Sequence, residues 1–422
     1  MQSLEDQRGV LLDTFKRVRA NTESLAAPLS AEDQCIQSMP DVSPTKWHRA
    51  HTTWFWETFL LKARQPDYTE FDAEFCFLFN SYYEQVGARH PRHERGFLSR
   101  PSCEEVGQYR AHVDAAVAAF FDSATDEAIA AATPILRLGF AHEEQHQELL
   151  LMDIKHVLSM NPCSPRAYPF EGAPQAEIAG DVQFLPFEGG LVEIGHAGDG
   201  FSFDNETPRH KVWLEPFSLA DQPVTNGDYQ AFIDDGGYST ATLWLSDGWA
   251  KISDAGWTAP LYWRRHDDAW LEFTLHGDVP LDPGAPVCHL SYYEAQAFAE
   301  WAGARLPGEA EWEQASKAAA PEGRFMVPGQ SAQPGPSPAG EGLKQMFGGV
   351  WEWTRSDYAP YPGFRPPQGA VGEYNGKFMS GQNVLRGGSC ATPSGHVRAT
   401  YRNFFPPDAR WAYSGLRLAR DI

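Results

Sequence analysis

Apolar residues in the first part of the chain recur every three or four positions, which is the spacing of one face of an α-helix. The segments with this spacing are residues 5–18, 51–63, 104–121 and 132–158. Helix starts are indicated at Ser43, which precedes a proline, and at Ser102, which precedes two glutamates and can cap a helix. Four such segments predict an antiparallel four-helix bundle over residues 1–160.

The pattern changes from about Val182 onward, where short runs of alternating apolar residues are divided by glycine, proline, asparagine and aspartate. The expected strands lie within residues 184–195, 210–220, 383–391 and 415–419. Two helical stretches, residues 225–237 and 291–316, interrupt them. The second half, residues 182–422, is therefore expected to be a domain that mixes helices and strands, and residues 161–181 resemble a linker. The predicted fold class is α+β with two domains.

The composition narrows the class of protein. Of the 422 residues 42% are hydrophobic, which suffices for packed cores, and 34 basic against 56 acidic residues give a net charge of −22. Such a chain is repelled by phosphate backbones and anionic lipids, so neither nucleic acid nor a membrane is expected as a partner. Without a long apolar run or an apolar leader, a cytoplasmic protein is expected. The six cysteines lie far apart and form no C-x-x-C pair, which argues against a disulfide scaffold.

The strongest local signal for chemistry is a pair of histidines, His142 and His146. Residues four apart lie on one helix face, so both imidazoles can reach one metal ion. Glu143 makes the sequence HEEQH, which also matches the H-E-x-x-H pattern of zinc metalloproteases. Nothing downstream offers the further zinc ligand that such a protease normally uses, so this reading is disfavoured. The alternative to metal binding is that both histidines are surface residues on a polar helix.

A third ligand can come from a facing helix, since bundles build metal sites in this way. His48 and His51 lie three apart among aromatic residues, where a histidine is more often part of the core than a ligand. Three neutral imidazoles leave coordination positions open, which suits zinc or non-haem iron. Glu148 lies on another face of its helix, so we expect it beside the ligands or at the surface.

Longer motifs extend this picture to nearly the whole chain. SPTKWHRAHTTWFWE together with HEEQHQE resembles the metal-binding DinB-like bundle. In the second half NETPRHKVWLEPF, SYYEAQAFAEWAGARLPGEAEWE, GGVWEWT and VLRGGSC resemble the formylglycine-generating-enzyme-like domain, which has a C-type-lectin-like fold. The two domains in this order resemble the sulfoxide synthases of the ergothioneine pathway.

This resemblance implies an Fe(II) centre held by His51, His142 and His146, with O2 as co-substrate. That family joins hercynine, which is N-α-trimethylhistidine, to a thiol through a carbon–sulfur bond at imidazole C2. Iron fits such a reaction because it supplies redox chemistry, which zinc does not. Gln145 and Asn403 match family residues near the trimethylammonium group, and aromatic residues such as Phe404 would favour that cation.

The family also uses a phenol near the iron as a proton donor. Tyr82 and Tyr83 match the tyrosines of the cysteine-using branch, and they are the expected catalytic residues. Tyr358 and Tyr361 match the position used in the mycobacterial branch and are the next candidates. Each of these rings can instead be part of the core or of an interface.

The donor of the chalcogen atom is left open by the sequence. Phe405 and Ala409 stand where the γ-glutamylcysteine-using branch has a charged clamp, so that donor is disfavoured. Arg92 and Arg95 could bind the carboxylate of a smaller donor. Gly349 and the neutral residues 380–383 also depart from the family pattern and suit an uncharged donor. Cysteine and the selenosugar used by the sister selenoneine synthases are the two expected donors.

Two alternatives remain beside this hypothesis. A DinB-like metal-dependent thiol transferase would work without O2, and a non-catalytic protein would use the lectin-like half to capture a ligand. Formylglycine generation itself is disfavoured, because it relies on a pair of active-site cysteines and the second half holds only Cys288 and Cys390. Consumption of O2 in the presence of hercynine separates the oxidative enzyme from the other two.

Overall fold

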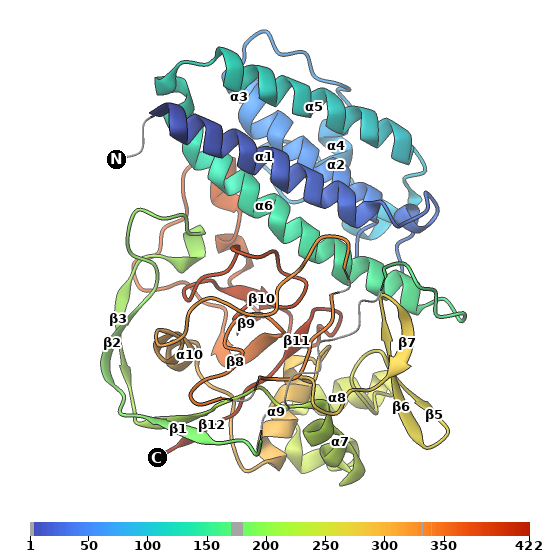
Figure 1. The fold of residues 1–422 in the computed structure, drawn as a ribbon, viewed down its shortest axis with the longest axis vertical. Coiled ribbons are helices and arrows are strands. Elements are labelled where there is room, and N and C mark those ends of the chain that lie inside the picture. Colours follow the sequence, from blue (N-terminus) through green and yellow to red (C-terminus); the bar gives the residue numbers. More distant parts are fainter. Residues whose placement is uncertain (1–3, 170–179, 331, 339) are drawn as a thin grey trace. The chain divides into compact units, whose positions relative to one another are not determined.

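The computed structural model describes residues 4–169, 180–330, 332–338 and 340–422, and Figure 1 shows the arrangement of the elements within each part. The chain divides into two compact units. Unit 1 comprises residues 1–163 and 368–374, and unit 2 comprises residues 164–367 and 375–422. The predicted bundle boundary at residue 160 thus lies close to the end of unit 1. Most of the second half of the predicted linker lies outside the described residues.

Unit 1 is a helical bundle. Its long helices are α1 (Leu4–Ala26), α2 (Thr45–Trp56), α5 (Cys103–Ser123) and α6 (Asp126–Ser159). Shorter elements are η1 (Asp33–Cys35), the π-helix η2 (Glu57–Leu61), α3 (Lys62–Arg64), α4 (Phe75–Phe79) and η3 (Arg92–Phe97). Helix α6 packs along α1 and α2, and α2 also packs along α5. The helices therefore correspond to the four segments that the apolar spacing indicates.

Local sequence explains where these helices begin and how closely they pack. The Ser102 hydroxyl accepts from the backbone N–H of Glu105, whose carboxylate accepts from the Ser102 N–H, so α5 starts with a complete capping box. Helix α2 starts directly after a proline, at Thr45. On α6, a Cβ added at Gly139 would lie 2.4 Å from the Trp56 ring, so the glycine allows α6 to approach α2 closely. Close approach of these two helices sets the distance between the histidines that they carry.

The described residues of unit 2 form four small sheets and short helices. The sheet orders are β1-β4-β12, β10-β9-β8-β11, β2-β3 and β5-β6-β7. The strands are β1 (Phe184–Phe187), β2 (Gly190–Ile194), β3 (His210–Leu214), β4 (Phe217–Ala220), β5 (Trp263–His266), β6 (Ala269–Thr274), β7 (Gly277–Pro280), β8 (Trp351–Asp357), β9 (Asn383–Arg386), β10 (Asn403–Phe405), β11 (Ser414–Gly415) and β12 (Ala419–Asp421). The helices are α7 (Asn226–Asp234), α8 (Ser246–Ala255), α9 (Tyr292–Trp301) and α10 (Glu309–Ser316). All strand pairs are antiparallel except β8 with β11.

Two details of unit 2 differ from the sequence-based expectation. Residues 291–316, expected to be helical throughout, form two helices, because the chain turns at Gly303, whose φ of +60° lies in the left-handed region. Strands β8 and β10, helix α8 and the sheet β5-β6-β7 lie outside the expected segments, and charged residues interrupt the apolar pattern in α8 and in that sheet. The mixed helix and strand content of the predicted α+β fold is confirmed.

Buried ion pairs stabilise the interior of unit 2. Arg417 is fully buried and donates to Glu352 at 2.7–3.0 Å through Nε and Nη2. Arg386, also fully buried, lies 3.1 Å from both Glu309 and Glu313. Each buried acid is thus neutralised by a planar cation that can bond to several oxygens at once.

A short segment distant in sequence belongs to unit 1. Residues 368–374 include η7 (Ala370–Glu373), and the Glu373 carboxylate accepts from the backbone N–H groups of Glu84 and Gln85, each at 3.0 Å. These two bonds hold the segment against the loop that contains Tyr82 and Tyr83. As a result, Tyr374 is part of the bundle.

Candidate metal centre

Three histidines of the bundle turn their ring nitrogens toward one point. His51 comes from α2, and His142 and His146 come from successive turns of α6. Their candidate ligand atoms all lie within 4.8 Å of one another, and the Nε2 atoms of His51 and His142 are 3.1 Å apart. Among the described residues this is the one group of three or more potential ligands that comes this close.

The surroundings keep these rings neutral. Burial lowers the pKa of His142 to about 3, and burial followed by the neighbouring histidines lowers the pKa values of His51 and His146 well below the usual range. A neutral imidazole has a lone pair to offer, whereas an imidazolium has none. Three neutral nitrogens converging on one point are therefore prepared to bind a cation.

Neighbouring groups fix the orientation of two of the rings. The Nδ1–H of His51 donates to the Phe79 carbonyl at 2.6 Å, which leaves Nε2 as its free ligand atom. Trp47 stacks on His51 with ring centroids 4.6 Å apart and planes within 10°. Phe55 stacks on His142 at 4.4 Å. The aromatic residues around His51 thus serve as a rigid support for a ligand.

Glu143, the acidic residue of the H-E-x-x-H pattern, is held elsewhere. Its carboxylate is fully buried and accepts from Arg19 at 3.1 Å, Arg110 at 3.2 Å and the Trp56 indole at 2.9 Å. Burial alone would raise its pKa, but Arg19 and Arg110 outweigh it and lower the pKa of Glu143 to about 2. A carboxylate bonded in this way cannot act as the general base of a zinc protease.

A tyrosine that the sequence analysis did not single out lies beside the histidines. The Tyr374 ring centroid is 5.9 Å from that of His142, and the Tyr374 hydroxyl donates to the Gln145 side-chain carbonyl. Gln145, expected to bind substrate, is partly exposed next to His146 on α6. Tyr374 and Gln145 are separated by 229 residues, so no local pattern could have connected them.

The expected tyrosine pair lies on the same side of unit 1. Tyr82 and Tyr83 stack with centroids 4.6 Å apart, and Tyr82 lies 6.4 Å from Tyr374. Tyr83 is fully buried against Trp54 at 5.6 Å, and burial raises the pKa of its hydroxyl well above the usual range. Tyr82 is partly exposed, so of the two it is the more accessible.

The second pair of candidate tyrosines is bonded within the interior of unit 2. Tyr358 accepts from the Asn205 side-chain amide at 2.9 Å, and Tyr361 accepts from Arg386 at 3.0 Å. Burial raises the pKa values of both phenols. Both hydroxyls therefore have hydrogen-bond partners inside unit 2.

The two candidate arginines have different surroundings. Arg95 is buried, its guanidinium lies 3.4 Å from the Trp47 ring centroid, and Nη1 donates to the Ser43 hydroxyl at 2.9 Å. It therefore supports the tryptophan that stacks on His51. Arg92 is exposed and donates to the Asp41 carbonyl.

The candidate substrate residues of unit 2 lie on β10. Asn403 is partly buried, and its side-chain oxygen accepts from the Phe404 N–H at 2.9 Å. Phe404 stacks on Tyr358 with centroids 4.0 Å apart. Phe405 packs against Trp411 at 5.6 Å.

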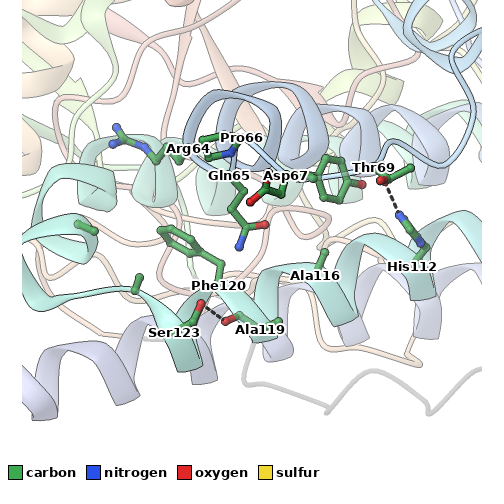
Figure 2. Close-up of a pocket in the computed structure, with 13 residues that line it drawn as sticks. Arg64, Gln65, Pro66, Asp67, Thr69, His112, Ala116, Ala119, Phe120 and Ser123 are labelled. Atoms are coloured by element: carbon green, nitrogen blue, oxygen red, sulfur yellow. Dashed lines mark hydrogen bonds between the residues drawn. The ribbon is translucent and has the colours of Figure 1, made fainter.

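A surface pocket of about 580 Å³ lies elsewhere on the bundle, between the stretch after α3 and helix α5. Two hydrogen bonds between lining residues are visible in Figure 2: His112 contacts the Thr69 carbonyl at 3.1 Å, and Ser123 donates to the Ala119 carbonyl at 2.8 Å. None of the residues predicted to bind metal or substrate lines it. No helix in the described parts of the chain is long and apolar enough to cross a membrane.

Fold and site together define a three-histidine helical bundle combined with a formylglycine-generating-enzyme-like domain. Residues 14–157 match the DinB superfamily, and residues 173–422 match the sulfatase-modifying factor enzyme 1-like domain.

Similar curated proteins share one or both domains. The hercynine oxygenase of Mycobacterium tuberculosis is 34% identical over 96% of this chain and 97% of its own length. Ergothioneine biosynthesis protein 1 of Schizosaccharomyces pombe is 29% identical over 52% of this chain and 28% of its own length. The formylglycine-generating enzyme of Streptomyces coelicolor is 30% identical over 60% of this chain and 93% of its own. The chain belongs to the ergothioneine-pathway sulfoxide synthase family and is an enzyme, which confirms the resemblance found in the motifs.

Proposed function

We propose that this enzyme uses Fe(II) and O2 to form a carbon–sulfur or carbon–selenium bond at imidazole C2 of hercynine. The observation that carries the proposal is the convergence of His51, His142 and His146 in a relative of hercynine oxygenases. The donor set fits iron, because three neutral nitrogens leave positions for substrate and O2. Iron bound there would supply the redox chemistry with O2 that the reaction requires.

Gln145, Asn403 and Phe404 are the residues that we propose bind hercynine, as the family resemblance implies. Gln145 is adjacent to His146 on α6, and its neutral side-chain oxygen, which accepts from the Tyr374 hydroxyl, is proposed to lie beside the trimethylammonium group. Asn403 and the face of Phe404 are also proposed to bind a trimethylammonium group, because the face of an aromatic ring attracts such a cation. Unmethylated histidine should bind more weakly, because its primary ammonium loses hydrogen bonds to water on entering an aromatic site.

The proposed proton source is a phenol of unit 1. Tyr374 holds its hydroxyl proton on the Gln145 oxygen, beside the His142 ring. Tyr82 and Tyr83 remain proposed catalytic residues, and their stacked rings adjoin Tyr374. The bonds of Tyr358 and Tyr361 inside unit 2 make them weaker candidates.

The proposed donor is cysteine or a selenosugar. Phe405 packs on Trp411 and Ala409 is buried, so neither position offers an ionic partner to a γ-glutamyl group. A charged donor that loses such a partner forfeits roughly 2–5 kcal/mol, which is about a 30-fold or larger loss of affinity. Arg92 is the exposed arginine that could bind a donor carboxylate.

The proposal is tested with Fe(II)-loaded protein, hercynine and each donor in turn, with and without O2, by mass spectrometry of the products. We expect an O2-dependent product with cysteine or the selenosugar and negligible product with γ-glutamylcysteine. Product formation without O2 would instead indicate a thiol transferase. Binding without turnover of any donor would indicate a ligand-binding protein.

A further inference from the structure

His48 lies three residues before His51 on α2, and both of its ring nitrogens have buried partners. Its Nδ1 lies 2.9 Å from Nδ1 of His146, and its Nε2 lies 2.9 Å from Oδ2 of Asp153. His48 and Asp153 are 2% and 3% exposed, so water does not compete for these bonds. The ring therefore connects a candidate metal ligand to a buried carboxylate.

The direction of the hydrogen bonds follows from the chemistry of the three groups. An ionised carboxylate only accepts, so Nε2 of His48 carries the proton toward Asp153. In a neutral His48 ring, Nδ1 then holds a lone pair and must accept from the partner nitrogen. His146 consequently carries its proton on Nδ1, and its Nε2 lone pair is free for a metal ion. The opposite direction would place a proton on Nε2 of His146 and block that ligand atom.

Other contacts hold the carboxylate in place. The backbone N–H of Ser43 donates to the same Oδ2 of Asp153 at 2.8 Å, and the Ser43 hydroxyl accepts from Arg95 at 2.9 Å. Asp153 follows His146 by two helical turns on α6, so both side chains lie on one face of that helix. The carboxylate is thus fixed relative to the histidine on which it acts.

His51 and His146 differ in the hydrogen-bond partner of the ring nitrogen that does not bind the metal. His51 donates to a neutral peptide carbonyl, that of Phe79. His146 faces the His48 imidazole, which is itself bonded to the Asp153 carboxylate. A partner imidazole that is polarised by a carboxylate accepts a hydrogen bond more strongly than a peptide carbonyl does, so His146 should be the stronger electron donor of these two.

We propose that the His48–Asp153 pair positions His146 for metal binding, by fixing its Nδ1–H tautomer and increasing the electron density at Nε2. The inference deepens the proposed function, because it rests on the three-histidine centre. His48 and Asp153 act through His146 and are positioning residues. A buried histidine that merely stabilises the bundle would affect folding but would leave the tautomer and electronic properties of a ligand unchanged.

The first test measures cobalt(II) binding by chelator competition and the visible absorption of the bound cobalt. The variants are Asp153→Asn, which keeps the shape and removes the charge, and His48→Phe, which removes both nitrogens. His112→Gln is the matched control, since His112 is also a histidine of the bundle but lies on α5 and bonds to the Thr69 carbonyl at 3.1 Å. We expect both test variants to bind cobalt about 10- to 100-fold more weakly with an altered visible spectrum, and the control to be unchanged. Unchanged affinity and spectrum in Asp153→Asn, or an equal loss in the control, would overturn the proposal.

The second test needs neither metal nor a substituted protein. Long-range proton–nitrogen NMR of the metal-free wild-type chain reports which nitrogen of each histidine is protonated. We expect His146 as the Nδ1–H form and His48 as the Nε2–H form, and a His146 ring protonated on Nε2 would refute the pairing. A chain with the expected tautomers that does not convert hercynine would refute the proposed function and still support the role of the pair.

Discussion

Both units bury acid–arginine pairs, but unit 1 also contains a cluster of three histidines. In unit 2 several buried acids bond directly to arginines, as Glu352 does to Arg417, and these pairs are complete within the fold. In unit 1 His51 and His142 face each other at 3.1 Å with both rings neutral, an arrangement that gains little unless a cation joins them. Glu143, next in sequence to His142, forms pairs of the first kind with Arg19 and Arg110. The difference teaches that a buried polar group with matched partners stabilises a fold, whereas convergent groups without them indicate a ligand.

The largest effects are expected from substitutions of Glu143 and His142, which are neighbours on α6 and should affect different properties. Glu143→Ala leaves Arg19 and Arg110 buried without their shared acid, so the free energy of unfolding should fall by about 3–5 kcal/mol. His142→Ala should fold but lose stable metal loading, because two ligands hold an ion poorly. Denaturant unfolding and metal analysis of both variants check this. The distinction between a stabilising acid and a metal ligand would be wrong if Glu143→Ala were as stable as the wild type, or if His142→Ala retained the full metal content.

A smaller effect is expected at the phenols. Tyr374→Phe removes the hydroxyl beside His142, so we expect bond formation to slow by about 100-fold while metal content stays constant. Tyr358→Phe, whose hydroxyl bonds to Asn205 inside unit 2, should keep its rate. Single-turnover kinetics and product ratios measure both. Should Tyr374→Phe react normally and Tyr82→Phe or Tyr83→Phe react slowly, the proton source is the predicted tyrosine pair.

The smallest effect should come from unit 2. Glu352→Gln keeps the size of the side chain but removes the charge that Arg417 contacts, so we expect a loss of about 1.5–3 kcal/mol in the stability of unit 2. Metal affinity should not change, since Glu352 contacts none of the three histidines. Thermal unfolding combined with cobalt titration tests this. A loss of metal binding in this variant would show that the two kinds of buried group are not independent.

The sequence predicted the helical bundle and the spacing of His142 and His146, because both follow from a period of 3.6 residues. It could not distinguish His48 from His51 by pattern alone. Both lie on α2, and their separate partners, Asp153 and His142, depend on how α2 packs against α6. The sequence could not predict the position of Tyr374 near the histidines, for a different reason. It enters unit 1 through a segment that is more than 200 residues away along the chain from α6, and such a contact leaves no local periodicity.

The central claim is that the three-histidine centre performs oxidative chemistry on hercynine. The most direct measurement is the amount of O2 consumed per hercynine converted by the Fe(II)-loaded chain, with the zinc-loaded chain and His146→Ala as references. The account predicts one O2 consumed for each hercynine converted and no conversion in either reference. Conversion of hercynine without O2 consumption, or equal conversion by the zinc-loaded chain, would contradict it.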